Sequence, residues 1–128
     1  MSILLAVFSA MAAPGLDAIS HTAWSPISLT YPTTSGTNED RTLTWTSGGT
    51  RDISLTDAGD GVDHNLQYRI NSGVWTNYTS GTFSVSTGQT LGFRITAAST
   101  DFGYIVIITD TTRGSVVDTF TISQTGAP

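Results

Sequence analysis

Cysteine is absent from the 128-residue sequence, so a disulfide framework, a thiolate metal site and a cysteine nucleophile are all excluded. Lysine is absent as well, and the five arginines are dispersed along a chain whose formal net charge is -5. Because phosphate binding needs clustered cations, we expect no nucleic-acid partner. The fold must be held together by packing alone, and we expect no cofactor.

Charged residues of either sign are scarce and make up only 12% of the chain. Solubility must therefore come largely from threonine, serine, asparagine and glycine. Threonine suits strands, because a β-branched polar residue packs well on a pleated sheet while its hydroxyl stays hydrated. Such a surface is typical of strand-rich proteins that are exposed outside a cell.

Long hydrophobic runs are also lacking. The apolar run from Ile3 to Met11 is far shorter than the roughly 20 residues that span a bilayer as a helix, so we expect no membrane span. Ala12 and Ala13 resemble the small residues of a signal-peptidase site, but no basic residue precedes the apolar run. Cleavage as a signal peptide therefore stays an alternative.

If this N-terminal segment is retained, its apolar side chains need a dry environment, and exposed apolar stretches usually mark interfaces. The segment either folds back on its own domain or inserts into a neighbouring subunit, and the sequence leaves both open. The residues predicted to anchor the chain in an assembly are Ile3, Leu4, Leu5, Val7, Phe8 and Met11.

Prolines and glycines punctuate the next stretch, with Pro14, Pro26 and Pro32 among them. Such residues break both helices and central strands. The sequence therefore predicts an extended N-terminal arm and linker over residues 1–40, followed by one domain over residues 41–128. A short edge strand between Trp24 and Tyr31 is compatible with the proline inside it.

From Arg41 onward, short segments alternate between apolar and polar residues and are separated by glycine-rich turns. This period of two is typical of strands with one buried face, and helical spacing is not sustained anywhere. The pattern predicts an all-β protein, an antiparallel β-sandwich of immunoglobulin-like type. The residues expected to face the core are Leu43, Trp45, Ile53, Leu55, Leu66, Tyr68, Ile70, Phe83, Val85, Leu91, Phe93, Ile95, Phe120 and Ile122.

The segment from Gly103 to Asp110 departs from this alternation because it is apolar on both faces. We expect a central strand whose outer side is covered by the N-terminal arm or by another subunit. In the last strand, Asp118 shares the phase of the core residue Phe120, which predicts a bulge or the end of the buried zone there.

Enzymatic chemistry finds little support in the residues. The histidines are His21 and His64, no nucleophile-elbow motif occurs, and Asp63 beside His64 is only a sequence neighbour. A glycosidase needs two carboxylates that flank a sugar cleft, whereas Glu39 and Asp40 are adjacent residues in the predicted linker. We expect no catalytic residues.

One loop carries Asp57, Asp60 and Asp63 between glycines. Calcium is held by several oxygen ligands on flexible loops of this kind, although the spacing is not that of an EF-hand. The alternative is a plain turn in which the aspartates cap backbone amides. We expect no metal, and these three residues are the candidate ligands if one is bound.

Aromatic side chains offer a second candidate site. Trp24, Trp75 and Tyr78 have flat faces that could stack on a sugar ring. Against this, Trp75 and Tyr78 are as readily explained as covers for the end of the domain.

The segment from Tyr68 to Thr96 combines a tyrosine-bearing strand, a turn at Asn71 and Gly73, a tryptophan at position 75 and a strand ending near Arg94. With Arg69, Gly88 and Thr90, this pattern resembles the immunoglobulin-like domains of bacteriophage capsid-decoration, tail and fibre proteins. The resemblance covers Arg41 to Ser123 and departs from the usual pattern at Gln89 and Gly92.

The resemblance implies a non-enzymatic structural protein of the virion, anchored by its N-terminal arm and displaying the domain outward. Its partners would be other virion proteins or copies of itself, and a host surface glycan or receptor is a further candidate. The alternative is a secreted or cell-surface adhesin or carbohydrate-binding module with a cleaved signal peptide.

Overall fold

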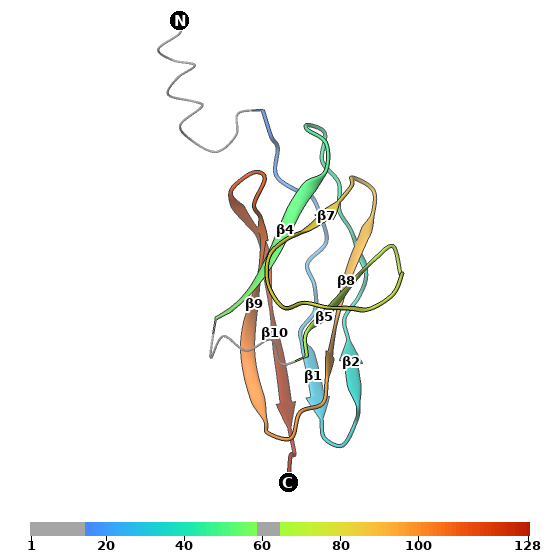
Figure 1. Ribbon diagram of the computed structural model, residues 1–128, viewed down its shortest axis with the longest axis vertical. Coiled ribbons are helices and arrows are strands. Elements are labelled where there is room, and N and C mark those ends of the chain that lie inside the picture. The colour runs from blue at the N-terminus through green and yellow to red at the C-terminus, as the bar shows by residue number, and fades with distance from the viewer. Residues whose placement is uncertain (1–14, 59–64) are drawn as a thin grey trace, which may run out of the picture.

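The computed structural model describes residues 15–58 and 65–128, and these form two β-sheets packed face to face (Figure 1). The first sheet has the order β1-β10-β9-β4-β7, and its strands are β1 (Ile27–Thr30), β4 (Arg51–Ala58), β7 (Phe83–Val85), β9 (Phe102–Asp110) and β10 (Ser115–Thr125). The second has the order β2-β8-β5-β6, with strands β2 (Ser35–Thr37), β5 (Gln67–Ile70), β6 (Thr76–Asn77) and β8 (Thr90–Thr96). A short strand, β3 (Arg41–Thr42), also pairs with β8.

The predicted all-β sandwich is confirmed. Most strand pairs are antiparallel, while β1 runs parallel to β10. Among residues 15–58 and 65–128, the structure has no helix with the length and apolarity that crossing a membrane requires.

The core lies between the sheets and follows the predicted alternation. Eleven of the residues expected to face inward are buried, whereas Tyr68, Ile70 and Phe83 are partly buried and pack against the others. The buried apolar side chains are Ile19, Trp24, Ile27, Leu29, Leu43, Trp45, Ile53, Leu55, Leu66, Val85, Leu91, Phe93, Ile95, Tyr104, Val106, Ile108, Phe120 and Ile122.

Residues 15–40 are part of the sandwich, which corrects the predicted boundary at residue 41. They supply β1 and β2, and four of their apolar side chains belong to the core. Pro26 precedes β1 and Pro32 follows it, so neither proline removes a hydrogen bond from the strand. The prolines flank a strand here instead of marking a linker. The predicted edge strand is β1 itself, with Ile27 and Leu29 inward.

Two local predictions are confirmed. The pairing of β10 with β9 shifts register between Val116 and Asp118, where the bulge was expected. The turn after β5 holds Asn71 and Ser72 at φ 54° and 57°, and the Gly73 N–H donates to the Ile70 carbonyl over 3.0 Å. Ser72, not Gly73, therefore takes the second left-handed position of this turn.

Candidate functional site

The outer face of the first sheet carries exposed apolar side chains on its central strand, β9. Along β9 the side chains alternate, with Tyr104, Val106 and Ile108 buried in the core. Between them, Ile105 is 44% exposed and Ile107 is half-buried. The predicted central position of this strand is confirmed, but in the described part of the chain nothing covers its outer side.

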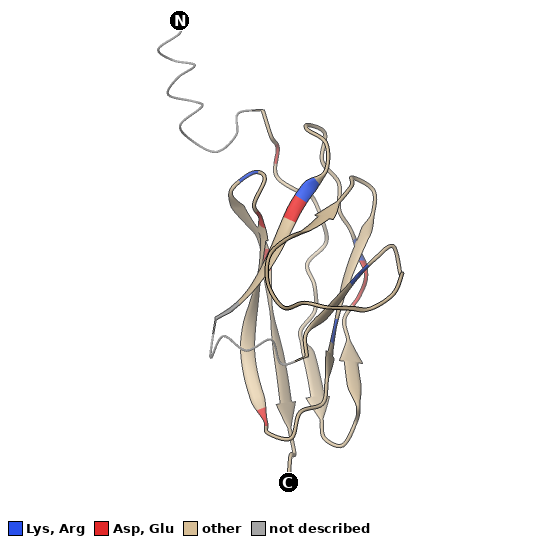
Figure 2. Cartoon of the chain, in the orientation of Figure 1, with Lys and Arg blue, Asp and Glu red and all other residues tan. Residues whose placement is uncertain are grey.

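The residues beside these two isoleucines are uncharged. Ile107 is paired with Thr119 on β10 and Thr56 on β4, and Ile105 is paired with Thr121 on β10. Asp110 and Asp118 are the charged residues of β9 and β10, and the register places both toward the end of the sheet where β9 ends and β10 begins. Figure 2 shows how few charged residues the strands carry. We call Ile105, Ile107, Thr119, Thr121 and Thr56 the isoleucine face.

A shallow, open depression of about 370 Å³ adjoins the isoleucine face. It spans three neighbouring pairs of β9 and β10 residues, from Gly103 and Ser123 to Ile105 and Thr121, and an added Cβ at Gly103 would meet no atom within 4 Å. The missing side chain thus leaves a hollow on an otherwise even sheet. Its lining comes from Gly103, Tyr104, Ile105, Thr121, Ile122 and Ser123.

A row of three polar side chains crosses the outer face of the second sheet. Register places Gln67 on β5 opposite both Arg94 on β8 and Asn77 on β6. Arg94 Nε donates to Gln67 Oε1 over 2.6 Å, and Gln67 Nε2 donates to Asn77 Oδ1 over 2.7 Å. This chain of hydrogen bonds fixes the orientation of the Arg94 guanidinium.

Trp75, a predicted site residue, lies beside this row. Its ring centroid is 4.9 Å from the guanidinium carbon of Arg94 and 4.4 Å from that of Arg69, so both cations contact the indole. Arg69 is also held by Asp40, with Nε to Oδ1 at 3.1 Å and Nη2 to Oδ2 at 2.7 Å. We call Trp75, Arg94, Gln67 and Asn77 the tryptophan–arginine cluster.

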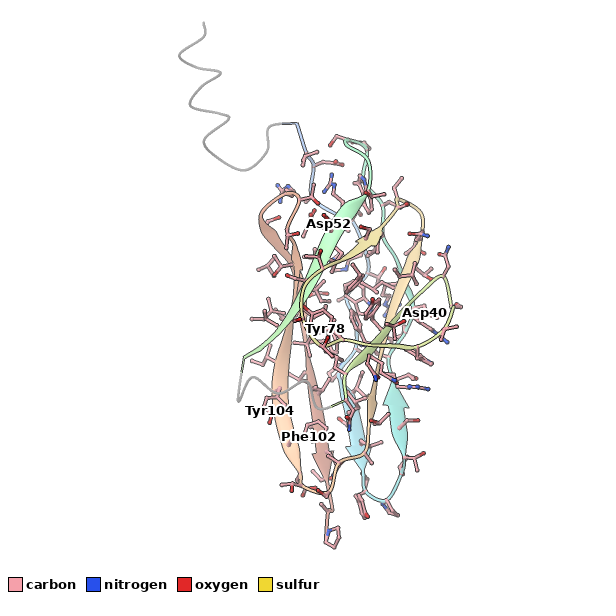
Figure 3. The ribbon with its side chains drawn as sticks, viewed as in Figure 1. Asp40, Asp52, Tyr78, Phe102 and Tyr104 are labelled. Atoms are coloured by element: carbon pink, nitrogen blue, oxygen red, sulfur yellow. The ribbon has the colours of Figure 1, made fainter. Side chains whose placement is uncertain are left out.

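Gly92 gives Asp40 its place beside the second sheet, where Figure 3 labels that aspartate. An added Cβ at Gly92 would overlap the Asp40 carboxylate. Gly92 pairs with Arg69, so the absent side chain leaves room for the carboxylate over its arginine partner. Gly92 thus has a structural role, because it makes room for Asp40.

Replacing Gly92 with alanine should displace Asp40 from Arg69 and lower the free energy of unfolding by about 1–3 kcal/mol, because a crowded methyl forces neighbouring groups to move. Urea unfolding of the variant measures this loss. Gly49→Ala is the control, since an added Cβ there meets no atom within 4 Å. Equal stability of the two variants would contradict the packing of Asp40 against Gly92.

The other two aromatic candidates have structural surroundings. Trp24 is only 4% exposed, and its Nε1 donates to the Leu91 carbonyl over 2.9 Å, so it offers no open face to a sugar. Tyr78 is half-buried between the sheets (Figure 3). Its hydroxyl accepts from Leu55 N–H over 3.1 Å and donates to the Gly81 carbonyl over 2.8 Å. The prediction that Trp24 and Tyr78 contact a ligand is therefore corrected, because both side chains are bonded within the framework of the domain.

Several predicted residues cannot be placed. The anchoring residues Ile3, Leu4, Leu5, Val7, Phe8 and Met11 lie outside the described residues, as do Asp60, Asp63 and His64 of the aspartate loop. Asp57 is in β4, but its side chain is also outside the description. In residues 15–58 and 65–128, no three histidine or carboxylate side chains gather as metal ligands would.

A buried arginine escaped the sequence analysis. Arg51 is fully buried, and its Nη1 donates to Asp110 Oδ2 over 2.7 Å and to the Asp17 carbonyl over 2.9 Å. Its Nη2 donates to the Ser47 carbonyl over 2.9 Å and lies 3.3 Å from Asp17 Oδ1. The sequence did carry a signal for this burial. Arg51 is spaced by two residues from Ile53 and by four from Leu55, so alternation places it on the same inner face.

Hydrogen bonding and burial shift three pKa values in this domain. The Ser47 hydroxyl, followed by the Thr46 backbone N–H, holds the pKa of Asp17 well below its usual range. The Ser25 hydroxyl is the largest cause that lowers the pKa of Glu39 to about 2. Burial, and then the neighbouring Tyr78, raises the pKa of Tyr68. None of the three residues belongs to the isoleucine face or to the tryptophan–arginine cluster.

Comparison with known proteins identifies no family. No family model matches the chain, and no curated protein matches it. Among solved structures, the chain is similar to the N-terminal domain of PorA, with 10% sequence identity and a TM-score of 0.39. That alignment covers 85% of this chain and 92% of the PorA domain.

Proposed function

We propose that the protein is a non-enzymatic structural module that joins a larger assembly through the isoleucine face. The observation that carries this proposal is the exposure of Ile105 and Ile107 on a central strand, among uncharged neighbours. Apolar side chains grouped on an even sheet face favour association with another protein, because contact removes them from water. The resemblance to immunoglobulin-like domains of bacteriophage proteins supports a virion as the setting.

The proposed occupant of the isoleucine face is the apolar segment 3–11 of a neighbouring copy. Its sequence supplies six large apolar side chains and no charge. Because the isoleucine face is uncharged too, docking would leave no ionised group buried without a partner.

The geometry of the first described residues supports this occupant. Arg113 Nε donates to the Leu16 carbonyl over 3.1 Å, and Arg51 holds Asp17, so the chain enters the sandwich near the end of β9. Along a strand, Ile105 is roughly 17 Å from Asp110, at about 3.4 Å per residue. Fourteen residues can extend to roughly 46–50 Å, so the length of the segment permits it to reach an isoleucine face on its own chain or on a neighbouring copy.

Complementation between two variants tests this arrangement. The first carries Ile105→Thr and Ile107→Thr, and the second carries Leu5→Ser, Val7→Ser and Phe8→Ser. The intact chain should self-associate, each variant alone should sediment as a monomer, and their equimolar mixture should form a heterodimer. In that heterodimer, the intact segment of one variant occupies the intact face of the other. Analytical ultracentrifugation measures the association state of the intact chain, of each variant alone and of the mixture.

The control is Val74→Thr, because Val74 is 86% exposed in the turn between β5 and β6, away from the isoleucine face. It should associate like the intact chain. A mixture that stays monomeric would show that the segment does not act between copies, and undiminished association of the isoleucine variant would remove the face from the proposal. The virion setting makes a separate prediction, namely that the native protein copurifies with nuclease-resistant particles. Recovery of the native protein without such particles would contradict this setting.

A carbohydrate-binding module is the second candidate function. The observation that favours it is the partly exposed Trp75 beside an arginine on the outer face of the second sheet. This surface is separate from the isoleucine face, so both functions can reside in one chain.

A further inference from the structure

Arg94 stands out among the arginines because, within the described residues, it has no carboxylate partner and no hydrogen bond to either of its Nη atoms. Arg41, Arg51 and Arg69 each lie within 4.0 Å of a carboxylate oxygen. Arg113 has no such partner, but its guanidinium donates to the Leu16 carbonyl and to Ser115 Oγ. For Arg94, only Nε has a hydrogen-bond partner in residues 15–58 and 65–128.

The two Nη atoms of Arg94 therefore present a donor pair that is free to bind an external acceptor. A guanidinium edge of this kind matches the two oxygens of a carboxylate, and it does so best when the guanidinium is already oriented. Gln67 supplies that orientation through the bond from Arg94 Nε, and Asn77 in turn fixes Gln67.

We propose that the tryptophan–arginine cluster binds an acidic sugar, a uronate residue of a polysaccharide. The Arg94 Nη atoms bind the carboxylate, the Trp75 indole packs against the sugar ring, and the Gln67 and Asn77 amides face its hydroxyls. Aromatic rings suit this role because their flat faces match the apolar faces of pyranose rings. The proposal rests on the second candidate function, a carbohydrate-binding module, and it concerns a different surface from the isoleucine face.

The charges around the cluster suit a single carboxylate. Asp40 would repel an anion, but two hydrogen bonds from Arg69 neutralise it. Arg69 is therefore paired with Asp40, and Arg94 is the cation of the cluster that is available to a ligand. One guanidinium matches one uronate carboxylate, whereas a nucleic-acid strand needs several cations to neutralise its phosphates.

Isothermal titration of the intact chain with trigalacturonate tests the proposal. We expect saturable binding that weakens as salt is added, because the contact is between opposite charges. The methyl ester of trigalacturonate keeps the sugar rings and removes the charge, so it should bind at least about tenfold more weakly. Trp75→Ala should also lose affinity by a similar factor, through the missing stacking surface.

Arg94→Gln should weaken binding of trigalacturonate at least about tenfold, since it removes the charge and the fork of donors. The matched control is Arg41→Gln, which deletes the same charge from an arginine already paired with Glu39 and should bind like the intact chain. Circular dichroism and thermal unfolding establish that each variant is folded.

Four results would overturn the proposal. One is the absence of saturable binding at millimolar trigalacturonate. Another is equal binding of the acid and its methyl ester. A third is equal binding of trigalacturonate by Arg94→Gln and Arg41→Gln. The fourth is displacement of trigalacturonate by sodium acetate at the same concentration, because the site would then recognise a bare carboxylate and not a sugar. None of these results bears on association through the isoleucine face.

Discussion

Replacing Arg51 with methionine is expected to lower the free energy of unfolding by about 3–5 kcal/mol, because it leaves a buried carboxylate without its partner. Asp110 is 1% exposed, and Arg51 Nη1 is the cation 2.7 Å from its Oδ2. Methionine is an unbranched, flexible apolar side chain that fills irregular spaces, so it removes the charge while keeping much of the packing of the arginine stem. Urea unfolding measures the difference.

The same substitution also releases the chain that precedes β1. Arg51 holds both the carbonyl and the carboxylate of Asp17, and its guanidinium lies 5.0 Å from the centroid of the Trp45 ring. The variant should therefore lose amide protection around Asp17 in addition to global stability. Hydrogen exchange of the backbone amides between Asp17 and Ser20 measures this local effect.

The control for Arg51→Met is Arg41→Met. Arg41 is paired with Glu39 at 3.5 Å, and both side chains are partly exposed, so the change should cost about 1 kcal/mol or less. A double variant, Arg51→Met with Asp110→Leu, should recover part of the lost stability because no buried charge remains. If Arg51→Met were no more destabilised than Arg41→Met, the buried network would not have the assigned role.

Sequence alternation was sufficient for the inner faces of the strands. Between Leu43 and Ile122, the strands other than β9 alternate apolar and polar residues, and a period of two then identifies their inward side chains directly. Arg51 obeyed the same rule, but a charged residue at the start of a strand is usually solvated. Burial of this arginine depends on Asp110, which is 59 positions away, and on Asp17 before β1.

The candidate sites depend on register, which no local pattern supplies. Gln67 alternates with the inward residues Leu66 and Tyr68, and it lies on the outer face of the second sheet. Its partner Arg94 is 27 positions further along the chain. Only the pairing of β5 with β8 places the two side chains together. Likewise, the exposure of Ile105 could not be derived from a run that is apolar on both faces, because covered and uncovered outer faces share that pattern.

Replacing Trp24 with alanine is the second large effect, with an expected loss of about 3–5 kcal/mol, because it opens a cavity in the core. The Trp24 ring lies 5.5 Å from Phe93 in an edge-to-face arrangement and 4.9 Å from His21. Loss of its Nε1 donor also leaves the Leu91 carbonyl without this partner. Chemical denaturation followed by circular dichroism measures the change.

Trp75→Ala is the matched control, since it removes the same kind of side chain from the partly exposed outer face of the second sheet. It should lower the free energy of unfolding by about 1 kcal/mol, which is the scale of an exposed cation–π contact. Trp24 belongs to the stretch that precedes Arg41, so the comparison also tests whether residues 15–40 unfold together with the rest. One cooperative transition with a shifted midpoint is expected. A separate early transition, or equal losses for the two tryptophans, would mean that this stretch only lies against a domain that is complete without it.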